Sequence, residues 1–300
     1  MKQGAEKIVC VGGSGRLGGE IVHKLVSAQY RVRCLVRKAS DITRLRETGA
    51  EIIVVDFSDA NVFEPFVSRG DTVISTFATD VARQPQTDGL WQNDYAINFR
   101  LVQTAVKKQV RKFIFTSYWG LAKFGCFEHG TIKKMIEDLL ILSGMDYTVL
   151  RITTLATDMS LLLGAVLKKR GIAPVIMKKN DRVRPILLAD LAACVVSAID
   201  NRRAAKRIIE VAGKEEYTFL ELEALFTTAI GKKVRLVFIP SRVAELIAVV
   251  IDSLTRCKYN GRGLVSAFSG GSTCDIGEMD RVFQVKQGSF RDYLNSHFAA

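Results

Sequence analysis

The stretch Lys7–Ser40, KIVCVGGSGRLGGEIVHKLVSAQYRVRCLVRKAS, decides the fold of this chain. It contains an apolar run of strand length, a glycine-rich turn, a segment with helical periodicity and a second apolar run. A glycine-rich loop that follows a strand and opens a helix is the context in which such a loop binds a dinucleotide. The sequence therefore predicts a dinucleotide site close to the N-terminus.

The spacing of three glycines gives each one a separate role. Gly12 makes the tight turn, Gly15 lets the backbone approach a pyrophosphate, and Gly18 lets the helix pack against the strand. The helix N-terminus then offers unpaired N–H groups to the phosphates. The alternative, a turn that is merely tight, does not account for the complete strand–loop–helix–strand unit. The loop residues expected to contact the cofactor are Gly12, Ser14, Gly15, Arg16, Leu17 and Gly18.

The end of the second strand indicates which dinucleotide is bound. An NAD site places Asp or Glu about 20 residues beyond the loop, where it holds the ribose hydroxyls. Here Val36 is followed instead by Arg37 and Lys38. These bases, together with Arg16, can meet a 2′-phosphate, which favours NADP(H) over NADH. The alternative is that Arg37 and Lys38 are only exposed loop charges.

Further cofactor contacts are expected after the third and fourth strands, because the loops at the carboxyl ends of parallel strands gather at one edge of the sheet. The loop after the third strand would meet the adenine, and the loop after the fourth would line the nicotinamide ribose. The residues expected there are Asp56, Phe57, Ser75, Thr76 and Phe77.

Strand-length apolar runs alternate with helical segments through the first half of the chain. The predicted strands are Lys7–Val11, Arg31–Val36, Glu51–Val55, Thr72–Ser75, Lys112–Thr116 and Tyr147–Arg151. The predicted helices are Arg16–Ala28, Asp41–Thr48, Asn61–Val67, Gln92–Gln109 and Thr131–Ser143. Strands such as EIIVVD and KFIFTS are apolar throughout, which is typical of strands buried on both faces. The alternation predicts an α/β fold with a doubly wound parallel (Rossmann) sheet.

The second half of the chain should form a small C-terminal α/β lobe. We expect residues 1–155 to form the cofactor domain, with 184–212 returning to it through the strand-like RIIEVAG. Residues 156–183 and 213–300 would then form the lobe that holds a substrate or partner. A helix near Asp158–Lys169, one in TFLELEALFTTAIGKK and one near Ser289–Phe298 are expected in or beside it.

Composition limits the classes of function. The formal net charge is +12, but the bases lie in short clusters near predicted helix C-termini, which favours solvated helix ends over an anionic partner. No nucleic-acid-binding motif is present. The six cysteines are far apart and form no C-x-x-C, which argues for a reducing compartment and against a zinc site.

Two features concern location. The N-terminus leads almost directly into a strand, leaving no room for a signal or transit peptide. No apolar run approaches the roughly 20 residues that span a bilayer. We therefore expect a protein of the cytoplasm or of an organelle matrix or stroma, with attachment to the surface of a membrane left open.

Several motifs together resemble the NmrA-like family of atypical short-chain dehydrogenases/reductases. They are VGGSGRLG, RCLVRK, VVDFSD, VRKFIFTSYWG and SGMDYTVLR, within Lys7–Arg151, and more loosely RPILLADLAA in the second half. The resemblance implies NADP(H) binding. It leaves the activity open, because the family includes reductases such as divinyl chlorophyllide reductases, redox sensors without turnover, and accessory proteins such as photosystem assembly factors and a respiratory complex I subunit.

The resemblance also implies candidate catalytic residues. Many relatives carry Tyr-x-x-x-Lys at the start of the helix that precedes YTVLR, where this chain has His129 and Lys133. Lys133 would hold the nicotinamide ribose, and Ser117 stands at the family's serine position. His129 replaces the tyrosine; an imidazole can donate a proton near neutral pH, but it can equally be a solvated residue at a helix start.

One segment of the second half is strongly amphipathic. In residues 241–256, SRVAELIAVVIDSLTR, one apolar stripe is flanked by bases. The stripe comprises Val243, Leu246, Ile247, Val250, Ile251 and Leu254, and the bases are Arg242, Arg256, Lys258 and Arg262. We favour a helix that faces the core of the small lobe over one that lies on an anionic membrane surface.

Two functions follow from these observations. The first, slightly favoured, is a reductase that passes hydride from NADPH to an unsaturated or carbonyl small molecule. The second is an accessory, assembly or sensor component of a protein complex, in which NADPH stabilises the fold without turnover. The missing tyrosine and the amphipathic segment favour the second; the intact glycine loop and Lys133 favour the first. The sequence does not indicate the substrate or the oligomeric state.

Overall fold

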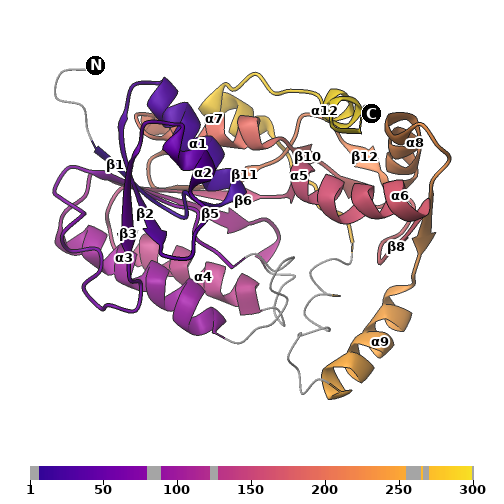
Figure 1. Ribbon diagram of the computed structural model, residues 1–300, viewed down its shortest axis with the longest axis horizontal. Coiled ribbons are helices and arrows are strands. Elements are labelled where there is room, and N and C mark those ends of the chain that lie inside the picture. The colour runs from indigo at the N-terminus through magenta and orange to yellow at the C-terminus, as the bar shows by residue number, and fades with distance from the viewer. Residues whose placement is uncertain (1–6, 80–88, 122–127, 255–264, 266–269, 299–300) are drawn as a thin grey trace.

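The computed structural model describes residues 7–79, 89–121, 128–254, 265 and 270–298. It has a mixed α/β architecture in which helices cover both faces of a central sheet, with a smaller lobe beside it (Figure 1). The sheet has the strand order β11-β6-β5-β4-β1-β2-β3, and every pairing in it is parallel. The predicted fold class, a doubly wound Rossmann sheet, is confirmed.

The seven sheet strands match the apolar runs of the sequence. They are β1 (Lys7–Val11), β2 (Arg31–Arg37), β3 (Glu51–Val55), β4 (Thr72–Ser75), β5 (Lys112–Tyr118), β6 (Tyr147–Ile152) and β11 (Arg207–Val211). The segment RIIEVAG supplies β11, which pairs with β6 at the edge of the sheet. The strand order reverses direction beside β1 and β4, and in open α/β sheets this switch point is where ligands bind.

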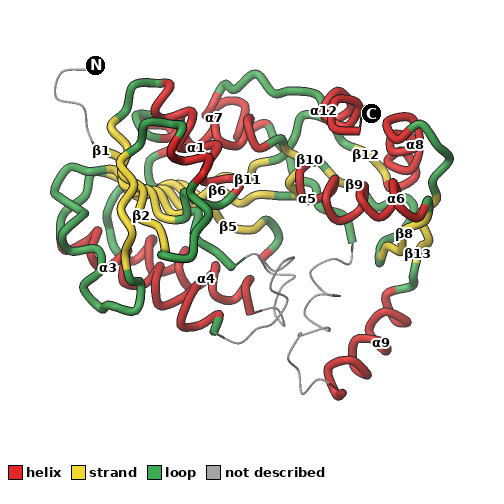
Figure 2. Tube along the Cα trace, in the orientation of Figure 1, coloured by secondary structure: helices red, strands yellow, loops and turns green. Residues whose placement is uncertain are grey.

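Two helical layers enclose the sheet (Figure 2). On one face, α1 (Arg16–Ser27) and α7 (Leu188–Ala198) share a core with the sheet through Ile21, Leu25, Leu191 and Val195. On the other face, α3 (Ala96–Lys107) and α4 (Glu128–Leu142) do the same through Leu101, Val102, Ile136 and Leu140. These side chains recur with helical spacing on one stripe of each helix, which is why the sequence pattern indicated the helices.

The small lobe contains most of the remaining regular structure. Its helices are α5 (Ala156–Met159), α6 (Ala165–Arg170), α8 (Phe219–Ile230), α9 (Ser241–Leu254) and α12 (Phe290–Phe298). Its short strands form three pairs, the first of which adjoins the sheet: β7 (Thr154–Leu155) with β10 (Pro185–Ile186), β9 (Arg182–Val183) with β12 (Tyr217–Thr218), and β8 (Ile172–Val175) with β13 (Arg235–Phe238).

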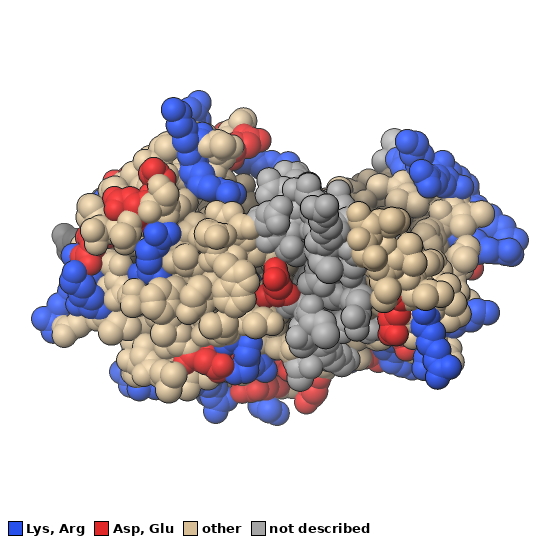
Figure 3. Space-filling view, turned by 90° about the horizontal axis from the view of Figure 1, so that it is seen from below, with Lys and Arg blue, Asp and Glu red and all other residues tan. Residues whose placement is uncertain are grey.

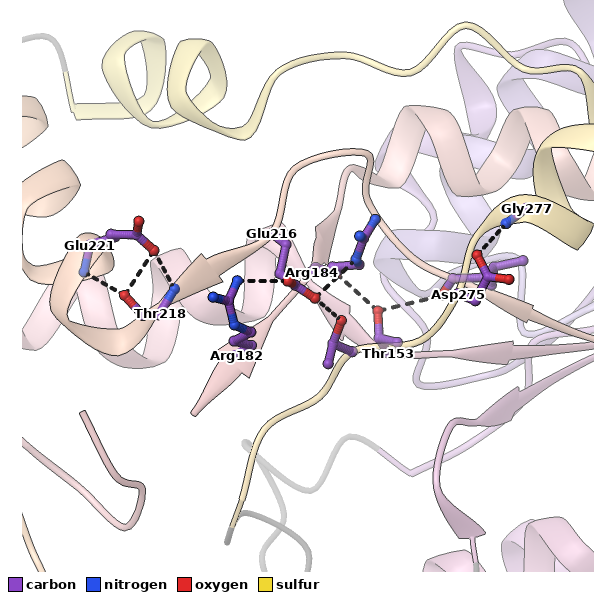
Figure 4. Close-up of polar contacts among 10 residues, drawn as sticks. Thr153, Arg182, Arg184, Glu216, Thr218, Glu221, Asp275 and Gly277 are labelled. Carbon is purple, nitrogen blue, oxygen red and sulfur yellow. Dashed lines mark hydrogen bonds and ion pairs between the residues drawn. The ribbon is translucent and has the colours of Figure 1, made fainter. Parts of the chain in front are cut away.

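A cluster around Glu216 fastens segments that are distant in sequence (Figure 4). Its carboxylate accepts hydrogen bonds from Arg182 Nη1 at 2.8 Å, Arg184 Nε at 3.3 Å and Thr273 Oγ1 at 2.5 Å. Thr153, just beyond β6, donates from Oγ1 to the carbonyl of Arg184 at 2.9 Å. These hydrogen bonds therefore connect the lobe to the carboxyl end of β6.

The structure corrects several predicted helices. Asn61–Val67 forms consecutive turns, because Pro65 has no N–H to donate in the middle of the segment. The predicted Asp41–Thr48 helix shrinks to α2 (Thr43–Arg46). The predicted helices at Gln92–Gln109 and Asp158–Lys169 each contain a π-helical turn, Trp91–Tyr95 and Ser160–Gly164. A helix that was not predicted, α11 (Gly277–Phe283), packs on the α7 side of the sheet.

A buried ion pair fixes α4 against the sheet. Glu137 of α4 is fully buried, and its two carboxylate oxygens lie 3.1 and 2.6 Å from Nε and Nη2 of Arg151 on β6. A bidentate Arg–carboxylate pair is among the stronger hydrogen-bonded contacts in proteins. Removing one partner leaves the other charge buried without compensation.

We therefore expect Glu137→Ala to lower the free energy of unfolding by about 3 kcal/mol, since breaking a buried pair typically costs that much. The exposed pair Lys134–Asp138 on the same helix supplies the control. Asp138→Ala should cost less than about 1 kcal/mol. Urea denaturation of the three proteins measures both values, and equal losses would show that the Glu137–Arg151 pair has no special role.

Candidate functional site

The glycine loop lies at the switch point, between β1 and α1, and two of its glycines cannot carry a side chain. Gly12 has a φ of +93°, and a Cβ there would lie 2.8 Å from Thr76 Oγ1 and from the Phe77 amide nitrogen. A Cβ on Gly18 would lie 2.1 Å from the carbonyl oxygen of Gly12. Both close approaches hold the start of α1 directly over the carboxyl ends of β1 and β4.

Gly15 provides the approach for a phosphate. It is the N-cap residue of α1, and no side chain caps this helix. Among the described residues, apart from its neighbours in the chain and in the helix, only the Gly12 oxygen, at 3.3 Å, lies within 4 Å of the position that a Cβ would take. The first N–H groups of α1 thus face a space that a pyrophosphate can enter, and the helix dipole favours an anion there.

The other loop residues divide between the surface and the core. Ser14 is exposed, and its hydroxyl donates to Ser40 Oγ at 3.3 Å. Leu17 packs against the core beneath α1. Arg16 forms an ion pair with Asp158 of α5, with 2.8 Å between Nη2 and Oδ1. Arg16 therefore links the glycine loop to the small lobe, an arrangement that the sequence did not indicate.

An open cavity of about 780 Å³ lies where β2 and β3 end. Four of the predicted cofactor residues line it: Arg37, Lys38, Asp56 and Phe57. A volume of this size is within the usual range of small-molecule sites, roughly 300–1,000 Å³. The cavity is where the adenosine half of a dinucleotide lies in a Rossmann fold, beside the phosphate loop.

Arg100 is a third base of this cavity, and sequence reasoning missed it. It lies on α3, lines the cavity, and donates from Nη2 to the carbonyl of Phe57 at 2.6 Å. Nothing local in the sequence marks it, because an arginine on an amphipathic helix is usually a solvated residue. Only the packing of α3 beside the β3 loop brings it next to Arg37 and Lys38.

The predicted contacts after β3 and β4 have defined partners within the protein. Asp56 accepts from Ser58, at 2.9 Å from the amide and 2.7 Å from the hydroxyl, and these hydrogen bonds lower the pKa of its carboxyl. Ser75 is buried and donates to Asn98 Oδ1 at 2.6 Å. Thr76 Oγ1 donates to the Gly12 carbonyl at 3.3 Å. These side chains shape the loops around the site.

Phe77, in the loop after β4, contacts Arg37 at the end of β2 and Phe57 in the loop after β3. Its ring packs against Phe57, with centroids 5.5 Å apart, and the Arg37 guanidinium lies over the same ring at 5.5 Å. A guanidinium at this distance from an aromatic face is attracted by the ring electrons. The contact orients Arg37 at the rim of the cavity and connects the β2, β3 and β4 loops.

Helix α4 presents a buried polar stripe toward the sheet. His129, Lys133 and Glu137 are spaced four residues apart and so share one face of the helix. All three are buried, although His, Lys and Glu are usually at least partly exposed. The predicted His129 and Lys133 are thus placed together by the helix itself.

His129 is held by an aspartate that the sequence analysis did not identify. Its Nδ1 lies 3.4 Å from Asp94 Oδ2, and both side chains are only 3% exposed. Asp94, in the π-helical turn Trp91–Tyr95, also accepts from the amide and hydroxyl of Thr79. Such π-helical turns are frequent at functional sites. A carboxylate bound to one imidazole nitrogen fixes the orientation of the ring, as it does in catalytic and metal sites.

Burial alone raises the pKa of the Asp94 carboxyl, but hydrogen bonds from His129 and Thr79, together with the nearby Lys133 charge, lower it overall. The carboxyl is therefore ionised at neutral pH and acts as an acceptor. A protein that keeps an ionised aspartate inside a largely apolar layer needs these donors close by.

Lys133 has an unusual environment for a lysine. Its Nζ donates to the carbonyl of Thr116 at 2.9 Å and lies 4.4 Å from the centre of the Phe115 ring. Burial lowers its pKa to about 8, although the charges of Asp94 and Glu137 act in the opposite direction. An ammonium with such a pKa can release and recover a proton near neutral pH.

Ser117 is also buried at this place, on β5 one residue after Thr116. Within the described part of the chain its Oγ has no hydrogen-bond partner. A buried hydroxyl without a hydrogen-bond partner is unfavourable. Ser117 Oγ is therefore a candidate to form a hydrogen bond with a bound ligand. The predicted catalytic residues therefore lie at adjoining positions of β5 and α4, with Asp94 added.

The model of the NmrA-like family matches residues 4–259. A photosystem II assembly factor Ycf39 of Cyanophora paradoxa is 31% identical over 145 residues, 48% of this chain and 44% of that relative. The Ycf39 of Synechocystis is 25% identical over 245 residues, 80% of this chain and 73% of the relative.

Solved structures show the same fold at low sequence identity. An NADPH-dependent quinone oxidoreductase of Escherichia coli, solved with NADPH, superposes with a TM-score of 0.76. The two chains are 16% identical, and the superposition covers 98% of this chain and 100% of the other. At this identity the likeness describes the architecture, a Rossmann sheet with a C-terminal lobe.

The lowered pKa of Lys133 predicts a pH dependence of stability. An unfolded lysine titrates near pH 10.4, whereas the folded group has a pKa of about 8. Between these values the unfolded chain binds more protons, so the free energy of unfolding rises with pH. Relative to Lys133→Met, the wild type should gain up to about 3 kcal/mol between pH 8 and pH 10.

Urea denaturation of both proteins across this pH range tests the prediction. Subtracting the Lys133→Met curve removes the contributions of other groups that titrate in the same window. Two curves that stay parallel would show that Lys133 keeps an ordinary pKa in the folded protein.

Proposed function

The chain belongs to the NmrA-like family, and on that premise we propose that it binds NADP(H) and passes hydride to an unsaturated or carbonyl small molecule. The observation that carries the cofactor proposal is the cavity lined by Arg37, Lys38 and Arg100, next to the open N-terminus of α1. Three bases around one cavity suit a phosphorylated ribose better than the bare hydroxyls of NADH.

In this proposal the cofactor lies in the larger part of the chain, residues 1–155 with 184–212, and the substrate lies under the lobe of residues 156–183 and 213–300. The glycine loop binds the pyrophosphate, the bases at the end of β2 and on α3 bind the 2′-phosphate, and Ser75–Phe77 line the nicotinamide ribose. NADP(H), when bound, supplies the hydride. The E. coli quinone oxidoreductase of the same architecture was solved with NADPH, which supports the choice.

Reduction of the substrate by hydride also requires a proton, which side chains of the protein can donate. Lys133, with a pKa of about 8, holds a proton beside the Thr116 carbonyl and can donate it. His129, oriented by Asp94, is one helical turn away and can take the place of the family tyrosine as an acid. Ser117 Oγ supplies a hydrogen bond to a polarised substrate oxygen. Each group is buried, so proton transfer takes place away from bulk water.

A second function is favoured by one feature of the same site. The three candidate catalytic side chains are at most 4% exposed, so a substrate reaches them only after a rearrangement. The chain would then be an accessory component that binds NADP(H) without turnover. The two Ycf39 relatives are named as photosystem II assembly factors, which supports a partner that is a protein complex at a membrane. Its location would be a matrix or stroma, at the surface of that membrane.

Nucleotide titration tests the cofactor. We expect NADPH to bind more tightly than NADH, and Arg37→Asp or Arg100→Gln to weaken NADPH binding about tenfold or more, because each removes a charge-assisted contact. NADH binding should change little. Arg44→Asp on nearby α2, outside the cavity, is the control and should leave both affinities unchanged. Equal affinities for the two nucleotides would contradict the proposal.

Turnover separates the two functions. NADPH oxidation is followed with a panel of quinones and α,β-unsaturated carbonyl compounds as probes. For a reductase, His129→Gln should reduce kcat about a hundredfold, the size of a lost acid catalyst, while NADPH affinity is retained. Binding of NADPH without oxidation by any probe would support the accessory function instead.

A further inference from the structure

Helix α9 faces the protein with its smallest side chains. Ala244 and Ala248, one turn apart, are buried and pack with Ile176, Ile239 and Val265. Small residues at these positions let the helix lie close to the ends of β8 and β13. The contact with the lobe is therefore narrow and is made mainly by methyl groups.

The large aliphatic side chains of α9 point outward. They are between 45% and 80% exposed and comprise Val243, Leu246, Ile247, Val249, Val250 and Leu254. The prediction that the apolar stripe of this helix faces the core of the lobe is therefore wrong. The stripe exists, but Ala244 and Ala248 make the contact with the core instead. In Figure 1, α9 extends downward from the lobe. We call these six side chains the α9 ridge.

Single exposed leucines are ordinary, but six on consecutive turns of one helix indicate an interaction site. Among the described residues, no helix is both long and apolar enough to cross a bilayer. A 14-residue amphipathic helix with an exposed apolar face and bases beside it has the features of a helix that lies in the plane of a membrane surface.

The surroundings of the α9 ridge are basic. Lys178 and Lys179 follow Ile176, which packs on α9, and Arg242 stands in its first turn, with one acid, Glu245, in the turn that follows. The other bases of residues 165–180 and 230–250 lie at the opposite ends of β8 and β13. Lys179 Nζ lies 6.0 Å from the ring centre of Phe238, at the end of β13 from which α9 continues. Figure 3 shows uncharged surface on the lobe with lysines and arginines at its edges. Arg256, Lys258 and Arg262, predicted to flank the helix, lie outside the described residues.

We propose that the α9 ridge docks on an anionic lipid surface. The aliphatic side chains would enter the boundary between headgroups and acyl chains, while Lys178, Lys179 and Arg242 would meet the lipid phosphates. Apolar area and basic charge act together in this kind of binding. A second copy of the chain fits less well, because it would bring two strongly basic surfaces together.

This docking is independent of nucleotide binding and of turnover, so it goes beyond the function proposed above. It gives Lys178, Lys179 and Arg242 a role that the cofactor site does not. No residue of the α9 ridge lines the cavity at the ends of β2 and β3.

Vesicle flotation of the full chain tests the proposal without nucleotide. Vesicles of phosphatidylcholine alone and of phosphatidylcholine with phosphatidylglycerol are the probes. We expect binding only to the anionic vesicles, reduced at least about tenfold by the double variant Leu246→Ser/Ile247→Ser. Lys178→Gln/Lys179→Gln should reduce it roughly fivefold for each lysine that contacts the surface, and added salt should weaken it.

The matched control is Ile141→Ser/Leu142→Ser, an exposed aliphatic pair on α4. It should leave flotation unchanged, and circular dichroism verifies that each variant is folded. Absence of flotation with anionic vesicles would overturn the proposal, as would equal losses in the α9 and α4 variants. Light scattering that shows a dimer broken only by the α9 variant would overturn it in favour of a second copy.

Discussion

The contact between Gly18 and the Gly12 carbonyl is the constraint on which the rest of the site depends. With 2.1 Å between a hypothetical Cβ and that oxygen, only glycine lets α1 approach β1 so closely. This approach aims the helix N-terminus at the switch point and brings the β4 loop, through Thr76, against the glycine turn. The open N-terminus of α1 and the ion pair of Arg16 with Asp158 of the lobe both depend on where α1 begins.

A second level of organisation lies behind this loop, in the buried polar stripe of α4. Each buried charge has a partner on a different element: Asp94 from the π-helical turn, Thr116 from β5 and Arg151 from β6. The partners make burial tolerable, and burial in turn moves the pKa of Lys133 toward neutrality. The same contacts that hold the layer together thus place His129 and Lys133 where the proposed proton transfer requires them.

The cofactor site and the α9 ridge lie on different parts of the molecule and use charge differently. At the cavity, three bases surround a small space and suit a compact phosphate; on the lobe, bases are spread around an apolar helix and suit an extended surface. Nucleotide binding at the sheet, together with docking of the α9 ridge on a lipid surface, fits either a reductase of a membrane-associated substrate or a component of a membrane complex.

The sequence by itself determined the sheet, the glycine loop and the family, because buried parallel strands and glycine spacing are local patterns. It indicated Arg37 and Lys38, which line the cavity, and His129 and Lys133, which share a face of α4, while their roles in binding and catalysis stay predictions. It could not reveal Asp94 or Arg100, whose roles arise from contacts across elements. It also assigned the stripe of α9 to the core, because periodicity shows that one face is apolar but not what covers it. Only the tertiary structure decided that alanines fill the core contact and that the large aliphatic side chains face outward.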